Sequence, residues 1–417
     1  MEKIIVKKSL PLVGDVSISG SKNATLPIFA ATLLCNGECR IKNVAPLSDV
    51  MLMCELLEKL GAQITHLDDE IVINIPKIKS HIAPYELASK MRASFLVMGP
   101  LLARCGRTRI SLPGGCPIGA RPVDLHLKGF ASLGAKINIG HGYVEAKADA
   151  LHASKIYLDF PSVGATENLI MAASLINGQT IIENAAIEPE VVDLAGFLNK
   201  AGAKISFAGE GTVCIDGVDE LCGCEYSVIS DRIEAGTFMV AAAATHGKIK
   251  LQNINSRHLK PVSAKLCEMG ALIEEGTDYI IIDASNKLKC VDIKTLPYPG
   301  FPTDMQAQMA ALMSCTDGAG IITETIFENR FLYVPELRRM GAHIKIDGRC
   351  AMVDETRSMS GAKVDATDLR SGAALIIAGL AAKGDTEIGN IWHIERGYHN
   401  IVKKLQGIGA NIDILKL

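Results

Sequence analysis

Leu60-Gly61-Ala62 is the first of six closely similar tripeptides in this chain. The others are Leu133-Gly134-Ala135, Ala201-Gly202-Ala203, Met269-Gly270-Ala271, Met340-Gly341-Ala342 and Ile408-Gly409-Ala410. Each follows a helix-like stretch and precedes an alternating apolar segment. Glycine is favoured just after a helix where the backbone must adopt a positive φ. A recurrence every ~70 residues indicates one structural unit used six times.

The rest of the unit recurs as well. Each unit has an Ala-rich apolar stretch followed by a glycine-led strand such as Gly178-Gln179-Thr180-Ile181-Ile182. The six apolar stretches are 24–34, 91–104, 166–176, 233–245, 304–314 and 371–382. They are apolar on most faces and are expected to be buried helices, whereas the later helix of each unit is amphipathic and faces solvent. The unit therefore reads strand, buried helix, strand, outer helix, strand, strand, and the fold class is α/β.

Six units divided three and three predict two lobes with helices inside and small sheets outside. The sixth unit ends near Leu415, and the only strand left unassigned is Asp15-Val16-Ser17-Ile18. We therefore expect the N-terminal segment to close the last lobe. The expected lobes are residues 22–229 and residues 1–21 with 230–417. A cleft between two such lobes is a natural ligand site.

Composition narrows the class of protein. A net charge of −3 with 21% charged residues favours neither nucleic acid nor a membrane surface as a partner. No uncharged apolar run reaches the ~18 residues of a membrane span, and the N-terminal segment does not resemble a signal peptide. The twelve cysteines include no C-x-x-C pair. The expected compartment is the reducing cytoplasm, with most thiols packed as small core side chains.

One loop departs from the repeat. After its glycine-led strand the second unit has three glycines and three prolines around Cys116, which predicts a lid over residues 112–122. Arg121 supplies positive charge that favours a reactive thiolate. An incidental cysteine on a surface loop stays an open alternative. A zinc ligand is disfavoured because no second Cys or His stands nearby at ligand spacing.

Cations recur where the buried helices begin. They are Lys22, Arg92, Arg232 and Arg370, and Arg330 and Arg396 precede outer helices in the last two units. Helix N-termini are already partly positive, so added cations suit a site for an anion. For any single arginine, a surface ion pair with a neighbour such as Glu328, Asp368 or Glu395 is the alternative. Asp304 fits either a helix N-cap or a general base.

Five motifs together carry a family resemblance. They are Ser19-Gly20-Ser21-Lys22-Asn23-Ala24, the loop from Pro113 to His126, Phe301 to Gln308, Glu324 to Phe331, and Ala366-Thr367-Asp368-Leu369-Arg370. Over essentially its whole length the chain resembles the enolpyruvyl transferases that act on UDP-N-acetylglucosamine. The resemblance implies a two-lobed inside-out α/β barrel of six repeats, three per lobe. It also implies transfer of the enolpyruvyl group of phosphoenolpyruvate to the 3′-hydroxyl of UDP-N-acetylglucosamine, with release of phosphate. That reaction is the first committed step of peptidoglycan synthesis and uses no metal or other cofactor.

The resemblance also implies residue roles. Cys116 is the general acid on the lid, can form a covalent phosphoenolpyruvate adduct and is the residue that fosfomycin alkylates. Asp304 is the base near the attacking hydroxyl. Lys22, Arg121 and Arg396 hold the phosphate, and Arg330 and Arg370 hold the carboxylate. The residues implied for the sugar nucleotide are Asn23, Arg92, Arg121, Pro122, Val123, Asp124, Leu125, Ser162, Val163, Gly164 and Ile326.

Two alternatives and one departure remain. The sister transferase acting on shikimate 3-phosphate lacks the lid cysteine and the Arg-Pro-Val-Asp-Leu segment present here. A non-catalytic paralogue that senses sugar nucleotide is disfavoured because every expected catalytic residue type is retained. Some family members have a lysine before the Ser162-Val163-Gly164 segment, where this chain has Phe160-Pro161, which puts one diphosphate contact in doubt.

Overall fold

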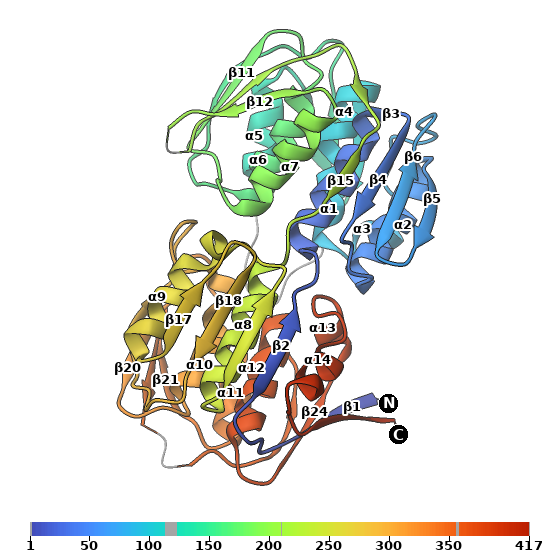
Figure 1. Cartoon of the computed structure of the whole chain (residues 1–417). Coiled ribbons are helices and arrows are strands. Elements are labelled where there is room, and N and C mark those ends of the chain that lie inside the picture. Colours follow the sequence, from blue (N-terminus) through green and yellow to red (C-terminus); the bar gives the residue numbers. More distant parts are fainter. Residues whose placement is uncertain (1, 113–122, 210, 356–357, 417) are drawn as a thin grey trace. The chain divides into compact units, whose positions relative to one another are not determined.

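The computed structural model describes residues 2–112, 123–209, 211–355 and 358–416. These residues form two compact units, which Figure 1 shows coloured along the chain. We call residues 20–229 the middle unit, and residues 2–19 with 230–416 the terminal unit. The boundaries between them fall between Ser19 and Gly20 and between Ile229 and Ser230.

The described residues of the middle unit form three sheets of three or four strands and one short pair. The sheets are, in strand order, β15 (Glu225–Ser227), β4 (Glu38–Lys42), β6 (Glu70–Asn74), β5 (Gln63–Leu67); β7 (Arg107–Ser111), β9 (Tyr143–Lys147), β8 (Lys136–Gly140); β10 (Lys155–Tyr157), β11 (Gln179–Glu183), β13 (Val213–Asp216), β12 (Lys204–Phe207); and the pair β14 (Leu221–Cys222), β3 (Cys35–Asn36). The helices are α1 (Lys22–Ala31), η1 (Thr32–Leu34), α2 (Ser48–Leu60), α3 (Tyr85–Ala88), η2 (Arg92–Val97), α4 (Met98–Cys105), α5 (Asp124–Ser132), α6 (Val163–Ala173) and α7 (Pro189–Lys200).

Three four-stranded sheets are formed by the part of the terminal unit that the structure describes. They are β2 (Val13–Ser17), β16 (Lys248–Gln252), β18 (Tyr279–Asp283), β17 (Leu272–Glu275); β19 (Ile293–Lys294), β20 (Gly320–Thr323), β22 (Cys350–Asp354), β21 (His343–Asp347); and β23 (Lys363–Asp365), β24 (Asp385–Gly389), β1 (Glu2–Lys7), β25 (Ile412–Lys416). The helices are α8 (Arg232–Ala244), η3 (Ser256–Leu259), α9 (Lys260–Met269), η4 (Thr303–Met305), α10 (Gln306–Met313), α11 (Val334–Arg339), α12 (Leu369–Ala381), α13 (Trp392–Glu395) and α14 (Ile401–Gly407).

Each four-stranded sheet follows one pairing rule. The strand before a buried helix lies parallel to a glycine-led strand, and a further antiparallel strand follows, as in β10, β11 and β13. In two sheets the parallel partners come from different halves of the sequence. β15 pairs with β4, and β2 pairs with β16. The segments on either side of the two unit boundaries are thus exchanged between the first and fourth repeats.

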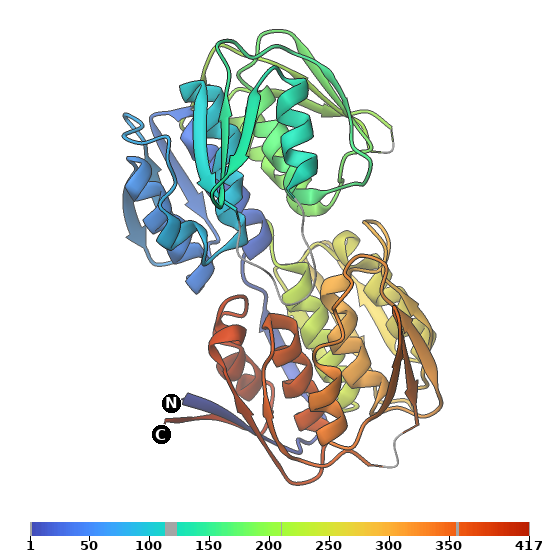
Figure 2. The same ribbon diagram turned by 180° about the vertical axis from the view of Figure 1, so that it is seen from behind.

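The N-terminal segment contributes two strands, not the single one expected from the sequence. β1 lies antiparallel between β24 and β25 and completes the sixth repeat (Figure 2). The strand expected from Asp15-Val16-Ser17-Ile18 overlaps β2, which pairs with β16 in the sheet of the fourth repeat. Both N-terminal strands lie in the terminal unit, the unit that the N-terminal segment was expected to close, and β1 is a strand that the sequence did not reveal.

Buried helices form the core of each unit. In the terminal unit α8, α10 and α12 pack against one another with the sheets outside them (Figures 1 and 2). All residues of α10 and all but the first of α8 are buried. Helices buried on every side must be apolar all round, which explains their Ala-rich composition. In α1 and α6 the only residues that are not buried are Asn23, Val163 and Gly164, all in the first turn.

The six repeated glycines have the predicted conformation. Their φ values run from 94° for Gly341 and Gly409 to 122° for Gly61. A second repeated feature was not foreseen. Asn43, Asn184 and Asn253 follow glycine-led strands with positive φ, and each side-chain amide donates to a carbonyl that follows the neighbouring parallel strand. Asparagine tolerates this conformation better than most residues because its amide can bond locally.

Candidate active site

The best-defined polar cluster of the terminal unit joins Asp304 to two arginines. Arg330 Nη2 donates to Asp304 Oδ1 at 2.9 Å, and Arg370 donates to Oδ2 from Nη2 at 2.8 Å and from Nε at 3.2 Å. The arginines are only 3% and 4% exposed, whereas the Asp304 side chain is 28% exposed. Three separate elements, η4, the loop before α11 and the first turn of α12, supply them. The exposed edge of the cluster is therefore the carboxylate.

The backbone of Arg370 is fixed by a helix cap, and one nitrogen of its side chain has no hydrogen-bond partner among the described residues. Asp368 caps α12 by accepting from the backbone N–H groups of Arg370 and Ser371. Burial is the largest single influence on Arg370 and opposes its charge, but Asp304, Tyr398 and Asp231 together outweigh burial and raise the pKa of the guanidinium. Nη1 of Arg370 is buried and has no hydrogen-bond partner in the described part of the chain. An unpaired buried donor is costly, so this atom favours an anionic ligand.

Arg370 packs against Tyr398, which belongs to a buried network of polar side chains. The guanidinium carbon lies 5.5 Å from the centre of the Tyr398 ring, within range of a cation–π contact. The Tyr398 hydroxyl is 2.9 Å from Thr237 Oγ1 and accepts from Gln308 Nε2 at 3.3 Å. Gln308 also donates to the backbone carbonyl of Asp304 at 2.9 Å. Burial raises the pKa of Tyr398, so it stays neutral and can donate. Sequence reasoning assigned no role to these three residues.

Two further candidates of the terminal unit are Arg396 and Ile326. Arg396 ends α13, is half-buried and lowers the pKa of His393, where burial is the larger cause. The negative charge of Asp368, which caps α12, acts in the opposite direction and raises the pKa of His393. Ile326 is half-buried, and its N–H donates to Glu324 Oε1 at 2.7 Å. The structure thus brings Asp304, Arg330 and Arg370 into direct contact and places Arg396 near the helix that carries Arg370.

Lys22 opens the first helix of the middle unit. Ser21 caps this helix by accepting from the backbone N–H of Ala24. Lys22 Nζ lies 3.2 Å from Asp49 Oδ2, and both side chains are buried. Asn23, the next residue, is exposed. A buried lysine beside a helix N-terminus combines a full charge with free backbone N–H groups, which is a favourable setting for phosphate.

His126 connects two further candidate residues. Its Nδ1 lies 3.0 Å from Asn168 Nδ2, and a Cβ atom on Gly164 would lie 3.3 Å from its Cε1. Because Asn168 Nδ2 can only donate, Nδ1 accepts and Nε2 carries the proton. Burial and, to a lesser extent, the charge of Arg92 lower the pKa of His126 to about 3. Arg92, Gly164 and the start of α5 therefore meet around one neutral histidine.

That histidine makes stability depend on pH in a defined direction. Its pKa in the folded state lies below the ~6.5 of an unfolded histidine. The stabilisation is therefore complete above pH ~6.5 and is lost as the pH falls, by up to ~1.4 kcal/mol per pH unit. Thermal melts should show that the advantage of the wild type over a His126→Gln variant shrinks between pH 6.5 and 4. An advantage that is constant over this range would contradict the assignment. The variant isolates His126 from Asp193, whose pKa burial raises to about 6 and which acts in the opposite direction.

The remaining candidates of the middle unit lie at two helix starts. Ser162 caps α6 by accepting from the backbone N–H of Ala165, and the helix begins at Val163. Val123, Asp124 and Leu125 form the start of α5. Phe160, where some family members have lysine, is exposed. The free N–H groups at the start of α6 are thus the remaining donors for an anion at this point.

Cys116, Arg121 and Pro122 lie outside the described residues, as does all of the expected lid except Leu112. Most of the other described thiols are core side chains, as expected. Cys35, Cys39 and Cys54 are buried in the core, and Cys105, Cys224, Cys290 and Cys315 are partly buried against it. Cys222 and Cys267 are exposed.

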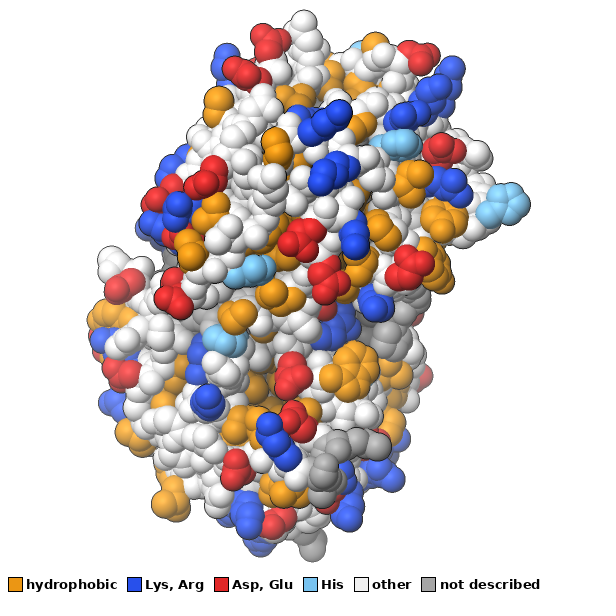
Figure 3. Space-filling view, turned by 90° about the vertical axis from the view of Figure 1, so that its right-hand side faces the viewer, with side chains coloured by type: hydrophobic (Ala, Val, Ile, Leu, Met, Phe, Trp, Pro, Cys, Tyr) orange, Lys and Arg blue, Asp and Glu red, His pale blue; other side chains and the backbone are white. Residues whose placement is uncertain are grey.

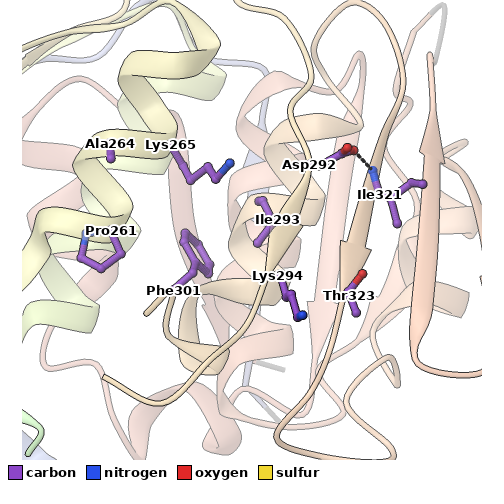
Figure 4. Close-up of a pocket in the computed structure, with 9 residues that line it drawn as sticks. All are labelled: Pro261, Ala264, Lys265, Asp292, Ile293, Lys294, Phe301, Ile321 and Thr323. Atoms are coloured by element: carbon purple, nitrogen blue, oxygen red, sulfur yellow. Dashed lines mark hydrogen bonds between the residues drawn. The ribbon is translucent and has the colours of Figure 1, made fainter. Parts of the chain in front are cut away.

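One cavity among the described residues lies away from these side chains. It has a volume of about 500 Å³ and lies in the terminal unit between α9 and the strands β19 and β20 (Figure 4). Figure 4 shows Lys265 on one side and Lys294 on the other, with Phe301 between them. None of the candidate site residues lines this cavity. On the face shown in Figure 3, acidic and basic side chains are interspersed, in keeping with the small net charge.

Two kinds of site find no support in the described part of the chain. None of its helices combines the length and apolar character needed to cross a membrane. Within those same residues, no three His, Cys, Asp or Glu side chains are grouped so as to hold a metal ion.

Comparison with solved structures defines the class of fold. The enolpyruvyl transferase NikO from Streptomyces tendae superposes with a TM-score of 0.90 at 24% identity, covering 100% of this chain and 99% of that one. The EPSP synthase of Acinetobacter baumannii superposes with a TM-score of 0.79 at 17% identity, covering both chains completely. The family described as EPSP synthase (3-phosphoshikimate 1-carboxyvinyltransferase) matches residues 6–405. The fold is therefore that of the EPSP synthase-like enolpyruvyl transferases, a mixed α/β architecture with many small sheets.

Sequence relatives define the branch within this class. The UDP-N-acetylglucosamine 1-carboxyvinyltransferase 2 of Carboxydothermus hydrogenoformans is 57% identical over 99% of both chains. The UDP-N-acetylglucosamine 1-carboxyvinyltransferase of Finegoldia magna is 52% identical over 100% of both. The chain belongs to the enolpyruvyl transferase family, in the branch of the UDP-N-acetylglucosamine 1-carboxyvinyltransferases.

Proposed function

We propose that this protein transfers the enolpyruvyl group of phosphoenolpyruvate to the 3′-hydroxyl of UDP-N-acetylglucosamine and releases phosphate. This is the first committed step of peptidoglycan synthesis, and we place it in the cytoplasm. The observation that carries the proposal is the identity of 52–57% over essentially the whole chain to relatives of that name. The cluster of Asp304 with Arg330 and Arg370 supports it chemically.

The reaction needs a base, an acid and a cage for negative charge. The 3′-hydroxyl adds to C2 of phosphoenolpyruvate while a proton is added to C3, and phosphate then leaves as C3 loses a proton. Asp304 accepts the hydroxyl proton, and Cys116 on the lid donates to C3. Cys116 can alternatively add to C2 and form a covalent adduct, and fosfomycin alkylates the same sulfur. The tetrahedral intermediate carries both carboxylate and phosphate, and fixed guanidinium groups stabilise such charge strongly.

The arginine pair holds the substrate carboxylate. Arg370 has one buried N–H without a partner in the described residues, and both arginines bind the Asp304 carboxylate. A substrate carboxylate offers them a second anion, which frees an Asp304 oxygen to accept a proton. Lys22, Arg121 and Arg396 hold the phosphate group.

The sugar nucleotide is bound mainly by residues of the middle unit. Arg121, Pro122, Val123, Asp124 and Leu125 hold the uridine, and Ser162, Val163 and Gly164 hold the diphosphate. The half-buried first turn of α6 supports the second assignment, since helix N-termini bind phosphates through free N–H groups. Asn23, Arg92, Asp304 and Ile326 contact the rest of the acceptor. The absence of a lysine at Phe160 leaves the α6 backbone with a larger share of the diphosphate.

The six small sheets support a more specific description of the fold. We interpret each unit as one inside-out α/β barrel of three repeats, with lobes of residues 22–229 and residues 1–21 with 230–417. We propose that residues 112–122, of which only Leu112 is among the described residues, form the lid of the second repeat. Three buried helices in the terminal unit and the exchanged strands β2 and β15 fit this description.

Phosphate release with two acceptors tests the function. Purified protein given phosphoenolpyruvate and UDP-N-acetylglucosamine should release phosphate in proportion to the acceptor consumed. With shikimate 3-phosphate it should release none above background. Release with shikimate 3-phosphate alone would establish the sister transferase instead. Tight binding of UDP-N-acetylglucosamine without any turnover would favour a non-catalytic sensor.

A further inference from the structure

Glu324 is a completely buried carboxylate with an unusual set of partners. Its exposed fraction is 0%. Oε1 accepts from Thr295 Oγ1 at 2.9 Å and from the backbone N–H groups of Ile326 and Phe327 at 2.7 and 3.1 Å. Oε2 accepts from Thr303 Oγ1 at 2.9 Å and Gln306 Nε2 at 3.3 Å. Within the described residues no lysine or arginine forms an ion pair with it, so neutral donors meet its charge.

These partners belong to two segments that carry active-site residues. Thr303 and Gln306 stand on either side of Asp304, in η4 and at the start of α10. Ile326 and Phe327 begin the loop that leads to Arg330, and the Arg330 guanidinium lies 5.6 Å from the Phe327 ring. Glu324 itself follows β20, where its backbone N–H donates to the carbonyl of Arg349. One buried side chain therefore fastens both segments to the edge of a sheet.

We propose that Glu324 is a positioning residue that fixes Asp304 relative to the loop of Ile326 and Arg330. The inference rests on the proposed function, since it assigns Glu324 to the same reaction. Glu324 touches no reacting atom. It acts through the hydrogen bonds that set the place of η4 and of the loop, and a displacement of about 1 Å in a reacting group can cost on the order of 10²-fold in rate.

Because the two carboxylate oxygens of Glu324 have different partners, substitution by alanine and substitution by glutamine should have different effects. Glu324→Ala removes all of these acceptors and leaves the half-buried backbone N–H groups of Ile326 and Phe327 without the carboxylate that accepts from them. In Glu324→Gln the oxygen can stay with those N–H groups while the new amide nitrogen faces Thr303 and Gln306. Gln306 Oε1 is buried and has no partner among the described residues, so a flipped Gln306 amide can accept from it. The glutamine variant should therefore keep much of the arrangement.

A double-mutant cycle with Asp304 separates positioning from general stability. Glu324→Ala should lower kcat with UDP-N-acetylglucosamine by ~10²-fold, and Glu324→Gln by less than ~10-fold. In an Asp304→Ala background the same Glu324→Ala change should cost less than ~3-fold, because coupled residues are not additive. Glu234→Gln serves as the matched control. This buried carboxylate of the same unit accepts from Ser19 N and Lys404, so its loss should lower the melting temperature but change kcat and KM by less than ~3-fold.

Each outcome decides the inference. Equal losses in both Asp304 backgrounds, or no loss of kcat in a folded Glu324→Ala protein, would overturn it. If Glu324→Ala does not fold, the cycle is run with Glu324→Gln, and additivity there counts against the proposal in the same way. Wild-type turnover is the reference measurement. Its absence refutes the proposed function, whereas active wild type with additive variants refutes only the role of Glu324.

Discussion

Replacing Asp304 with asparagine is expected to lower kcat for phosphate release by about 10²–10⁴-fold, the usual contribution of a general base. Asparagine keeps one oxygen but turns an amide N–H₂ toward a guanidinium that also only donates. Arg330 and Arg370 then share less negative charge. Breaking a fully buried ion pair costs ~3–5 kcal/mol. Asp304 is 28% exposed, so a smaller loss of unfolding free energy, about 2 kcal/mol, is expected.

Stopped assays of phosphate and thermal melts measure both effects on the same preparations. Asp292→Asn is the matched control, because this exposed carboxylate of the same unit accepts from the backbone N–H of Ile321 and lines the cavity of Figure 4. It should retain wild-type turnover. If Asp304→Asn also turned over at the wild-type rate, Asp304 would not be the base.

Replacing Cys116 with serine is expected to abolish turnover at neutral pH and to abolish alkylation by fosfomycin. A serine hydroxyl is a far weaker acid than a thiol and does not open the epoxide. The measurement is the mass of the intact protein after incubation with fosfomycin, followed by peptide mapping. Wild type should gain one adduct, on the peptide that contains Cys116.

The chain has eleven other cysteines, so labelling of Cys116 alone is a stringent test of the assignment. Burial raises the pKa of Cys54 and Cys315 to about 12 and that of Cys224 to about 11, so little thiolate is present at neutral pH. Cys267 is exposed, but partial burial and Glu275 raise its pKa as well. Cys222 is also exposed. Cys222→Ser and Cys267→Ser should therefore leave labelling unchanged, and an adduct that persists in Cys116→Ser would refute the assignment.

Local signals in the sequence were sufficient to predict much of the fold. A glycine is needed wherever a helix ends in a positive φ, so Gly61 and its five counterparts mark the repeat directly. Pairing between distant strands leaves no such local mark. Nothing in residues 2–7 or 13–17 specifies that one strand joins the sixth repeat and the other the fourth, because both are short and alternate only weakly. The recurring Asn43, Asn184 and Asn253 were a readable signal that was missed.

In the candidate site, too, some residues could be predicted from the sequence and others could not. Charged residues at helix starts could be found because their position in the repeat is fixed, and Asp304, Arg330 and Arg370 do meet. Their supports could not be found. Glu324 and Gln308 are polar residues in apolar surroundings, and only the folded chain shows which donors surround them. The roles of Cys116 and Arg121 stay predictions, because these residues lie outside those that the structure describes.

The transfer itself is tested most directly by identifying the product. Protein, phosphoenolpyruvate and UDP-N-acetylglucosamine are incubated together, and the sugar nucleotide is recovered for mass spectrometry and NMR. An enolpyruvyl ether on the 3′ oxygen, formed in equal amount to the phosphate released, is the expected result. Unmodified UDP-N-acetylglucosamine after many expected turnovers, or phosphate released without any new ether, would contradict the proposed reaction.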